Sequence, residues 1–558
     1  MTFHNIFNSQ TKSITFAAFL IAISSGISGV LGLIRDGLLA GRFGVWSETN
    51  SYFAAFRVND FFYNLFIIGG FAVVFLPLFA EYYSKEREKT WEMVSHVLNF
   101  FLFLLILASL FIFIFAPQLV KIITPGFSFE EKNQTAFLIR IMILSPILFG
   151  LSAIFSGILH YFNRFFIYSL APVLYNLGII FGILFLSPSF GIIGVSMGVV
   201  LGASLHWAVQ IPSVLNCGFK YRLLLNFRYP AIKKIFYLVI PRLFAVTSQQ
   251  INLIVITAIA STISGGIAIF TFANNLQHFP ISLVAIPFAI ASFPSLSRNW
   301  AANQKKDFLE NFSLIFRQIL FFMVPLTILL FILRAQVVRL VLGTLGDGKF
   351  DWVATQLIAA SLGLFCLGII AFAFIPYLAR TFFSFQDTKT PTFIAISTVL
   401  LNITLSFLLV WLLGFQNAFQ DFLVKILKLG GIENVTVVGL PLALSIAVTF
   451  QFFLLLFFLY RRIGDFGVKK IFSSFARIIS ASFLAGITTF FVLRLAAFFV
   501  ETDKVLGLLA QTVIAAFSGI LIYFILTLVF KFPELKIIVK SFKKQFRKEV
   551  TPVETESS

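Results

Sequence analysis

The sequence predicts an all-α polytopic membrane protein with fourteen transmembrane helices. Of its 558 residues, 59% are hydrophobic and only 12% are charged, whereas soluble domains carry about 25% charged residues. The mean hydropathy is +0.97. Apolar segments of about 20 residues, the length that crosses ~30 Å of hydrocarbon, recur along the whole chain.

These segments define the expected spans in order. We place them at 14–41, 51–80, 97–120, 136–159, 168–187, 190–212, 235–260, 267–296, 312–334, 352–379, 392–413, 437–460, 474–499 and 506–530. The run from 168 to 212 is far too long for one span, so Pro188 and Ser189 are expected to turn a hairpin. The first apolar run exceeds the ~7–15 residues of a signal-peptide core, so we expect no cleavable signal.

The distribution of basic residues predicts the orientation. The chain has 42 Lys and Arg against 23 Asp and Glu, a net charge of +19. If the amino terminus is cytoplasmic, most of the 42 fall in inside loops and tails, as the positive-inside rule requires. Both termini are therefore predicted to be cytoplasmic. The basic segments 220–234, 461–477 and 531–548 would face anionic lipid headgroups, and no soluble basic domain suggests a nucleic-acid partner.

Four charged residues interrupt the first two apolar spans. Arg35 and Asp36 lie in the first, Arg57 and Asp60 in the second. An ionised side chain at a bilayer centre costs at least ~2.5–3.5 kcal/mol, so such residues indicate a cavity, a counter-ion or a ligand. At 1.5 Å per residue both arginines lie about 9 Å below the outer boundary. One interpretation is that the pairs Arg35–Asp36 and Arg57–Asp60 only hold helices together; the other leaves a guanidinium free for a ligand.

The sequence shows no motif typical of a metal site or of an enzyme active site. Cys217 and Cys366 are far apart and lack the spacing of a zinc site or a disulfide framework. No paired carboxylates, histidine cluster or nucleophile motif stands out, so we expect neither a metal nor an enzyme.

An internal repeat suggests two pseudo-symmetric six-helix lobes. The second span carries Phe53-Ala54 and Phe75-Leu76-Pro77, and the eighth carries Phe272-Ala273 and Phe293-Pro294 with a two-residue slip. The repeated motif comes six spans later and at an equivalent depth in the membrane, which is typical of parallel transporter repeats.

The eighth span also carries a polar face. Asn274 and Asn275 lie four and three residues before His278, so they share one side of the helix. This face would lie opposite the arginines if the two lobes face each other. The alternative for His278 is a hydrogen-bonded packing residue.

Several motifs together resemble one known family. They are Gly32-Leu33-Ile34-Arg35-Asp36, Ala40-Gly41-Arg42-Phe43-Gly44, Ala55-Phe56-Arg57, Phe75-Leu76-Pro77, Glu81-Tyr82, Thr124-Pro125-Gly126-Phe127, Asn163-Arg164-Phe165, Ala171-Pro172, Asn176, Phe279-Pro280, Pro294-Ser295-Leu296-Ser297, Ala379-Arg380 and Gln386-Asp387-Thr388-Lys389-Thr390-Pro391. In this order, over about 14–530, the chain resembles the MurJ/MviN family of lipid II flippases, within the superfamily of multidrug and polysaccharide exporters. The resemblance implies two six-helix lobes plus two carboxy-terminal helices.

The resemblance also implies a function and a site. The family moves a polyprenyl-pyrophosphate-linked peptidoglycan precursor from the inner to the outer leaflet of the bacterial cytoplasmic membrane. Arg35 and Arg57 match basic cavity positions and Asp36 an acidic one; guanidinium suits pyrophosphate because it binds oxygens bidentately. Arg242, at the cytoplasmic entrance of the seventh span, either contacts a phosphate or extends to lipid headgroups. With Asp60, Asn274, Asn275 and His278, these residues form the expected substrate site.

The sequence departs from the family pattern at charged cavity positions. Neutral residues or histidine stand at Gly29, Tyr63, Asn64, Ile68, Ile256, Asn275, His278 and Ser406. This implies a less charged cavity and places a sodium site in doubt. We therefore expect no cofactor, and transport driven by the membrane potential or an ion gradient. Gly69-Gly70, Pro77, Pro280, Pro287 and Pro294 are expected bending points for alternating access.

The expected organisation is a cytoplasmic amino terminus (1–13), an N-lobe (14–212), a basic linker (213–234), a C-lobe (235–460), two final spans that form a lipid-tail groove (461–530) and a basic cytoplasmic tail (531–558). The expected partners are a polyprenyl-linked glycan lipid and the bilayer, with the chain acting as a monomer. Alternatives are a flippase for another polyprenyl-linked glycan, a drug or cation exporter, a membrane enzyme such as a glycan polymerase, or a scaffold.

Overall fold

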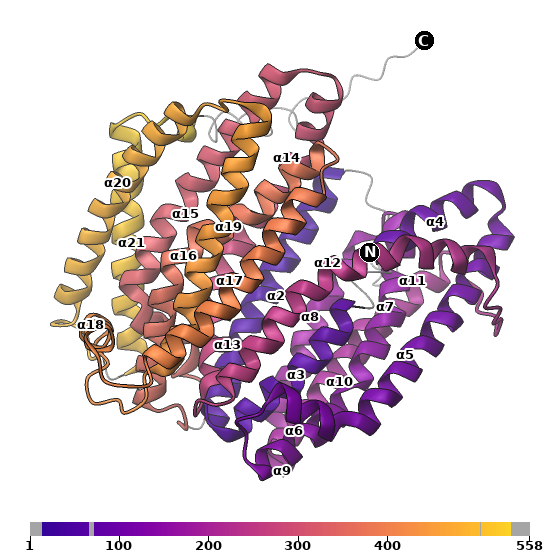
Figure 1. Ribbon diagram of the computed structural model, residues 1–558, viewed down its shortest axis with the longest axis horizontal. Coiled ribbons are helices and arrows are strands. Elements are labelled where there is room, and N and C mark those ends of the chain that lie inside the picture. The colour runs from indigo at the N-terminus through magenta and orange to yellow at the C-terminus, as the bar shows by residue number, and fades with distance from the viewer. Residues whose placement is uncertain (1–13, 66–71, 347, 503, 537–558) are drawn as a thin grey trace. The chain divides into compact units, whose positions relative to one another are not determined.

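The computed structural model describes residues 14–65, 72–346, 348–502 and 504–536. Within these ranges all regular structure is helical, as predicted (Figure 1). In chain order the elements are α2 (Ile14–Phe43), α3 (Ser47–Tyr63), α4 (Ala72–Lys85), α5 (Arg87–Ile123), α6 (Phe129–Met142), α7 (Leu144–Tyr161), α8 (Phe165–Phe181), η2 (Gly182–Leu186), α9 (Ser187–Phe190), α10 (Ile192–Ala208), α11 (Ile211–Leu215), α12 (Pro230–Ala260), α13 (Gly266–Pro280), η3 (Ile281–Ala285), α14 (Ile286–Ala301), α15 (Lys305–Leu342), α16 (Trp352–Ser384), α17 (Lys389–Leu412), α18 (Ala418–Leu427), η4 (Thr436–Val438), α19 (Gly439–Ile463), α20 (Val468–Ala496) and α21 (Val505–Val529).

Twelve helical segments of the described chain are long and apolar enough to cross a membrane. They coincide with twelve of the fourteen predicted spans. The other two, at 51–80 and 235–260, fall on α3 with α4 and on α12, where part of the chain or its side chains lies outside the described residues. The polytopic helical class is confirmed, and the count of fourteen stays a prediction.

The hairpin expected between 168 and 212 is present, but Pro188 and Ser189 lie in the short helix α9 and do not make the turn. The chain turns at Gly191, whose φ of 58° lies in the left-handed region that glycine adopts without strain. The two arms, α8 with η2 and α10, approach so closely that a Cβ on Gly178 would lie 2.3 Å from the Cα of Gly202. Small residues permit this backbone contact, which is a common means of helix association in membranes.

The chain packs as two compact units. The first comprises 1–276, 341–361 and 395–447, and the second 277–340, 362–394 and 448–558. Aromatic rings fill both cores. In the first, Phe79 is fully buried against Tyr161 of α7, with ring centroids 5.0 Å apart. In the second, Phe316 of α15 stacks on Phe374 of α16 at 4.1 Å. The lobe boundaries expected from the sequence stay a prediction.

Among the expected bending points, Pro280 lies where the helix departs from α-helical geometry, whereas Pro77 and Pro294 lie inside α4 and α14. α13 ends at Pro280, and the π-helix η3 separates it from α14. In the second predicted span, α3 gives way to a π-type turn at Asn64 and Leu65. π-Bulges are rare and often occur at functional positions. The two segments that echo each other in sequence thus share this local feature, while Gly69-Gly70 and Ile68 lie outside the described residues.

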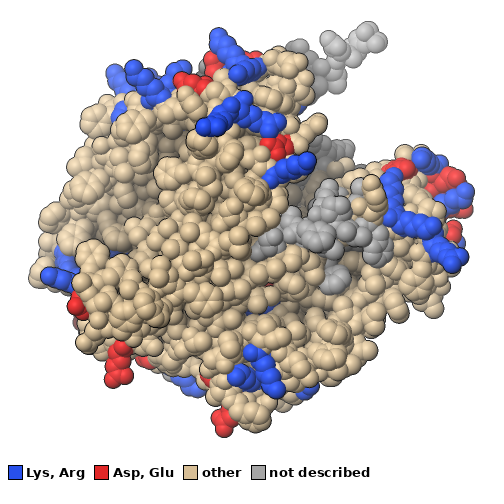
Figure 2. All heavy atoms as spheres, viewed as in Figure 1, with Lys and Arg blue, Asp and Glu red and all other residues tan. Residues whose placement is uncertain are grey.

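Charged side chains gather near helix ends, and the faces between them are largely uncharged on the side that Figure 2 shows. Many large apolar residues of the described chain are exposed, among them Phe483 of α20 and Phe517 of α21. A contiguous apolar exterior of this kind suits lipid rather than water. This surface agrees with a multi-pass membrane protein.

Candidate functional site

Arg35 of α2 is held by neighbours on two helices. Its Nε and Nη2 donate to Oδ1 of Asp36 at 3.0 and 2.8 Å, and its Nη1 donates to Oδ1 of Asn176 on α8 at 3.2 Å. The Arg35 side chain is 21% exposed and that of Asp36 4%. Adjacent residues on a helix point about 100° apart, so the long arginine side chain must fold back to reach its neighbour.

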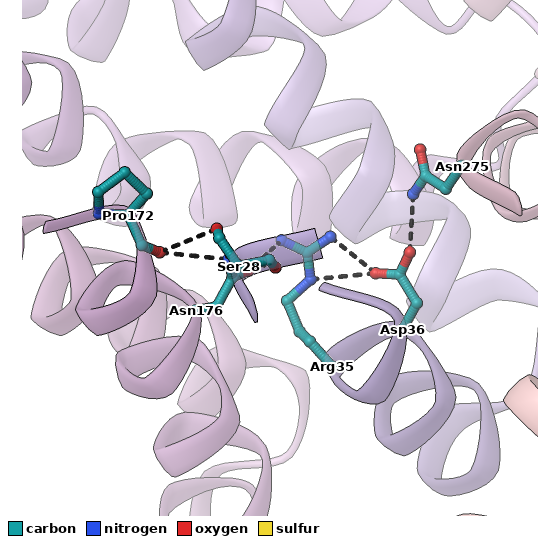
Figure 3. Close-up of polar contacts among 6 residues, drawn as sticks. All are labelled: Ser28, Arg35, Asp36, Pro172, Asn176 and Asn275. Atoms are coloured by element: carbon teal, nitrogen blue, oxygen red, sulfur yellow. Dashed lines mark hydrogen bonds and ion pairs between the residues drawn. The ribbon is translucent and has the colours of Figure 1, made fainter. Parts of the chain in front are cut away.

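Asp36 connects α2 to α13. Its second oxygen, Oδ2, accepts a hydrogen bond of 2.8 Å from Nδ2 of Asn275 (Figure 3). Both carboxylate oxygens are therefore occupied, one by a cation and one by an amide. A buried carboxylate is tolerated only when it is paired in this way.

Asn176 continues this series of hydrogen bonds on the side of Arg35 opposite Asp36. Its Nδ2 donates to the hydroxyl and carbonyl of Ser28 and to the carbonyl of Pro172, at 3.0 to 3.3 Å (Figure 3). The sequence prediction did not place Asn176 in the site. An amide inside the apolar segment 168–187 was the available signal, because buried amides in membranes need partners.

Arg57 and Asp60 of α3 form a looser pair. Arg57 Nη1 lies 4.0 Å from Asp60 Oδ2, and their side chains are 15% and 38% exposed. The Nε of Arg57 is buried and makes no hydrogen bond to any described residue. The pair interpretation from the sequence is thus correct in geometry for both arginines, but Arg57 retains a buried donor that its partner does not use.

The two arginines line one cavity of about 170 Å³. Its wall brings together α2, α3 and α13, through Arg35, Tyr52, Phe53, Phe56, Arg57, Asp60, Thr271, Asn274 and Asn275. Aromatic rings around two guanidinium groups reduce the local dielectric and strengthen their attraction for an anion. The wall also contains Tyr52 and Thr271, which the sequence does not distinguish from ordinary span residues.

Three expected site residues are not among those that line this cavity. Asp36 bonds the lining residues Arg35 and Asn275 but does not line the cavity itself. His278 is exposed on α13, in the second unit, and is not among the residues that line the pocket. Arg242 lies on α12, and its side chain is outside the described residues. In the described part of the chain, no three His, Cys, Asp or Glu side chains are grouped so that they could hold a metal ion.

The helical arrangement is similar to that of a solved membrane transporter. A multidrug resistance MATE family transporter of the MOP superfamily, in an inward-facing conformation, matches with a TM-score of 0.62 at 12% identity, over 81% of this chain and 99% of that one. At this identity the likeness concerns the fold alone.

A more specific likeness defines the family. A structure titled lipid II flippase MurJ, inward closed conformation, matches with a TM-score of 0.72 and 27% identity, over 92% of this chain and 98% of that one. Probable lipid II flippases MurJ from Buchnera aphidicola (27% identical; 85% of this chain, 96% of the relative) and Haemophilus influenzae (30%; 67% and 77%) are similar in sequence. The chain belongs to the lipid II flippase MurJ family, whose model matches residues 39–509.

Proposed function

We propose that this protein is a flippase that moves lipid II, a polyprenyl-pyrophosphate-linked peptidoglycan precursor, from the inner to the outer leaflet. The observation that carries the proposal is the cavity with two guanidinium groups inside a transporter fold of the MurJ family. Lipid II presents a pyrophosphate between its lipid and its sugars, and this group needs cationic donors when it leaves water.

Arg35 has donors left for such a ligand. A guanidinium carries five N–H groups, and three of them are used by Asp36 and Asn176. The two that remain belong to Nη1 and Nη2, the end of the fork that binds phosphate oxygens bidentately. Arg57 adds its unpaired Nε from the same wall.

Asp36 acts as a positioning residue in this scheme. It fixes the Arg35 fork from one side while Asn176 fixes it from the other. Pre-organised donors lose less entropy when the ligand arrives. The ion pair also stabilises the helices, so the two interpretations of the pair raised by the sequence are compatible.

The transport cycle follows from these assignments. The headgroup crosses in the cavity by alternating access, while the lipid tail stays in the bilayer along the last two spans. The protein works as a monomer in the bacterial cytoplasmic membrane, with both termini in the cytoplasm, and performs no covalent chemistry. We propose the membrane potential as the energy source, because neutral residues stand at charged positions of the family pattern.

The test is replacement of the resident lipid II flippase in a model bacterium by this chain. Wild type should restore growth and the appearance of lipid II at the outer leaflet. Arg35→Ala and Arg57→Ala should each lower transport by at least about tenfold, since a charge-assisted hydrogen bond contributes about 1.5–3 kcal/mol. Arg140→Ala is the matched control, because Arg140 of α6 donates to the carbonyl of Phe113 away from the cavity.

Full activity in both cavity variants would remove the pyrophosphate argument. A wild type that is expressed but transports no lipid II, in cells or after reconstitution, would indicate another polyprenyl-linked glycan.

A further inference from the structure

A second and larger cavity lies in the first unit, with a volume of about 650 Å³. Its wall is formed mainly by α2, α7, α8 and α10. The lining contains six serines, two tyrosines and two histidines, and no Asp, Glu, Lys or Arg. The volume falls in the range of small-molecule sites, about 300–1,000 Å³. None of the residues expected from the sequence to bind substrate lines this cavity.

The polar groups of the wall are held in place by one another. Ser152 Oγ lies 2.7 Å from Nδ1 of His206 and accepts a 2.5 Å hydrogen bond from Nε2 of Gln210. Ser156 Oγ donates to Oε1 of Gln210 at 3.1 Å. His160 follows on the same face of α7, and its Nε2 is buried without a hydrogen-bond partner among the described residues. The cavity therefore presents hydroxyls that a hydrogen-bond network holds in fixed positions.

Aromatic rings complete the wall. Tyr63 packs edge-on against Phe149 at 5.1 Å, and Tyr168 packs edge-on against His160 at 4.1 Å. Rings beside neutral hydrogen-bonding groups suit a sugar, because a pyranose has apolar C–H faces and an equatorial rim of hydroxyls. A charged ligand would have no counter-ion in this wall, and burying a charge unpaired is costly.

The neutral cavity adjoins the anion site through one hydrogen-bonded chain. Ser28 lines the neutral cavity, and its Oγ accepts from Nδ2 of Asn176, whose Oδ1 accepts from Nη1 of Arg35 (Figure 3). Asn176 thus separates the neutral hydroxyls of this cavity from the guanidinium group of the anion site. The same order, sugar then pyrophosphate, exists in a polyprenyl-linked glycan.

We propose that this cavity binds the sugar next to the pyrophosphate and excludes the acidic peptide of the precursor. The proposal rests on the function proposed above. Ser156, His160 and Tyr168 contact the sugar, while Arg35 and Arg57 hold the pyrophosphate. The peptide remains outside, because its carboxylates find no cation in this wall.

The test measures binding of three lipids to the full-length protein in nanodiscs. The lipids are undecaprenyl pyrophosphate, undecaprenyl-pyrophosphoryl N-acetylglucosamine and lipid II. Ser25→Phe places a bulky ring in the cavity from α2, and Tyr168→Phe removes a single hydroxyl. Ser25→Phe should weaken binding of both sugar lipids by at least about tenfold, and Tyr168→Phe by roughly 2- to 12-fold, the range of one hydrogen bond. Both variants should leave undecaprenyl pyrophosphate within about twofold of wild type, since the anion site is unchanged.

Ile27→Phe is the matched control, because Ile27 is 48% exposed on the same helix and does not line the cavity. It should bind all three lipids like wild type. Unchanged sugar-lipid binding in both cavity variants, or an equal loss for the sugar-free lipid, would overturn the sugar site while leaving the flippase proposal intact. A wild type that binds none of the three lipids would instead overturn the proposed function.

Discussion

The carboxylate of Asp36 has two partners, the Arg35 guanidinium at Oδ1 and the Asn275 amide at Oδ2. The residue itself is 2% exposed. Removing one member of a buried ion pair leaves the other charge uncompensated and typically costs about 3–5 kcal/mol. Removing both members costs less, because no isolated charge remains.

This difference separates stability from function. Asp36→Ala should lower the thermal stability of the purified protein and its transport together, by about 3–5 kcal/mol in the free energy of unfolding. The double variant Arg35→Leu/Asp36→Ala should regain much of the stability and still transport nothing, because the pyrophosphate donor is gone. Transport recovered in the double variant would show that the pair has only a structural role.

At the scale of elements, α2 contacts the segment that follows α15. The backbone N–H of Lys349 donates to the carbonyl of Gly41 at 3.1 Å, and Trp46 Nε1 donates to Oδ2 of Asp351 at 3.0 Å. A Cβ on Gly41 would lie 1.5 Å from the carbonyl oxygen of Leu345. The backbones touch at this point, so the sequence requires glycine there.

The close backbone contact at Gly41 can be tested by making the same Gly→Ala substitution at two positions of α2. Gly41→Ala should displace the backbone of Leu345 and destabilise the protein by about 1–3 kcal/mol, as overpacking does. Gly26→Ala meets nothing within 4 Å, so it should be neutral or stabilise by up to about 1 kcal/mol through helix propensity. Thermal unfolding in detergent compares the two, and equal effects would contradict the contact.

The loop between α16 and α17 depends on an ionised Asp387. Burial opposes ionisation, but hydrogen bonds from the backbone and hydroxyl of Thr390, with the Arg462 guanidinium, outweigh it and hold the pKa of Asp387 below its ordinary value. Since the folded pKa is below the unfolded one, this stabilisation is present above the ordinary value near ~3.9 and is lost as pH falls through the folded pKa.

Asp387→Asn should therefore lower the melting temperature at pH 7 by a few degrees. The difference from wild type should shrink as the pH falls below the ordinary carboxyl value, and it should disappear once the pH is below the lowered pKa of Asp387, where the wild-type carboxyl is protonated too. Melting curves of both proteins across this range check the prediction. A difference that persists unchanged in acid would show that the charge of Asp387 does not matter.

At the scale of the whole molecule, the proposed energy source predicts the direction in which the membrane potential drives the headgroup. The cytoplasm is electrically negative, so moving an anionic headgroup outward is favourable by ~2.3 kcal/mol per net charge per 100 mV, roughly 50-fold in its distribution. In proteoliposomes, an imposed potential that is negative on the donor side should speed transport, and reversing it should slow transport.

Replacing sodium by choline should have no effect in the same assay. A requirement for sodium with no response to potential would refute this coupling. The membrane potential and the sodium gradient are varied at constant pH, so that proton coupling does not affect the comparison.

The sequence by itself determined the helical, polytopic class, twelve of the span positions and the hairpin at 168–212, because apolar length and turn residues are local properties. It also identified the family and the charged residues Arg35, Asp36, Arg57 and Asp60, since a charged residue within an apolar segment can be recognised from the sequence without a structure.

Only the tertiary structure decided which groups meet. Asn176 and Asn275 reach Arg35 and Asp36 from helices far along the chain, and the serine and histidine wall of the second cavity assembles from four separate helices. His278 shares a helix with Asn275 but lies outside the cavity wall. Such contacts depend on how helices pack and cross, and the periodicity of a single helix holds no information about its neighbours.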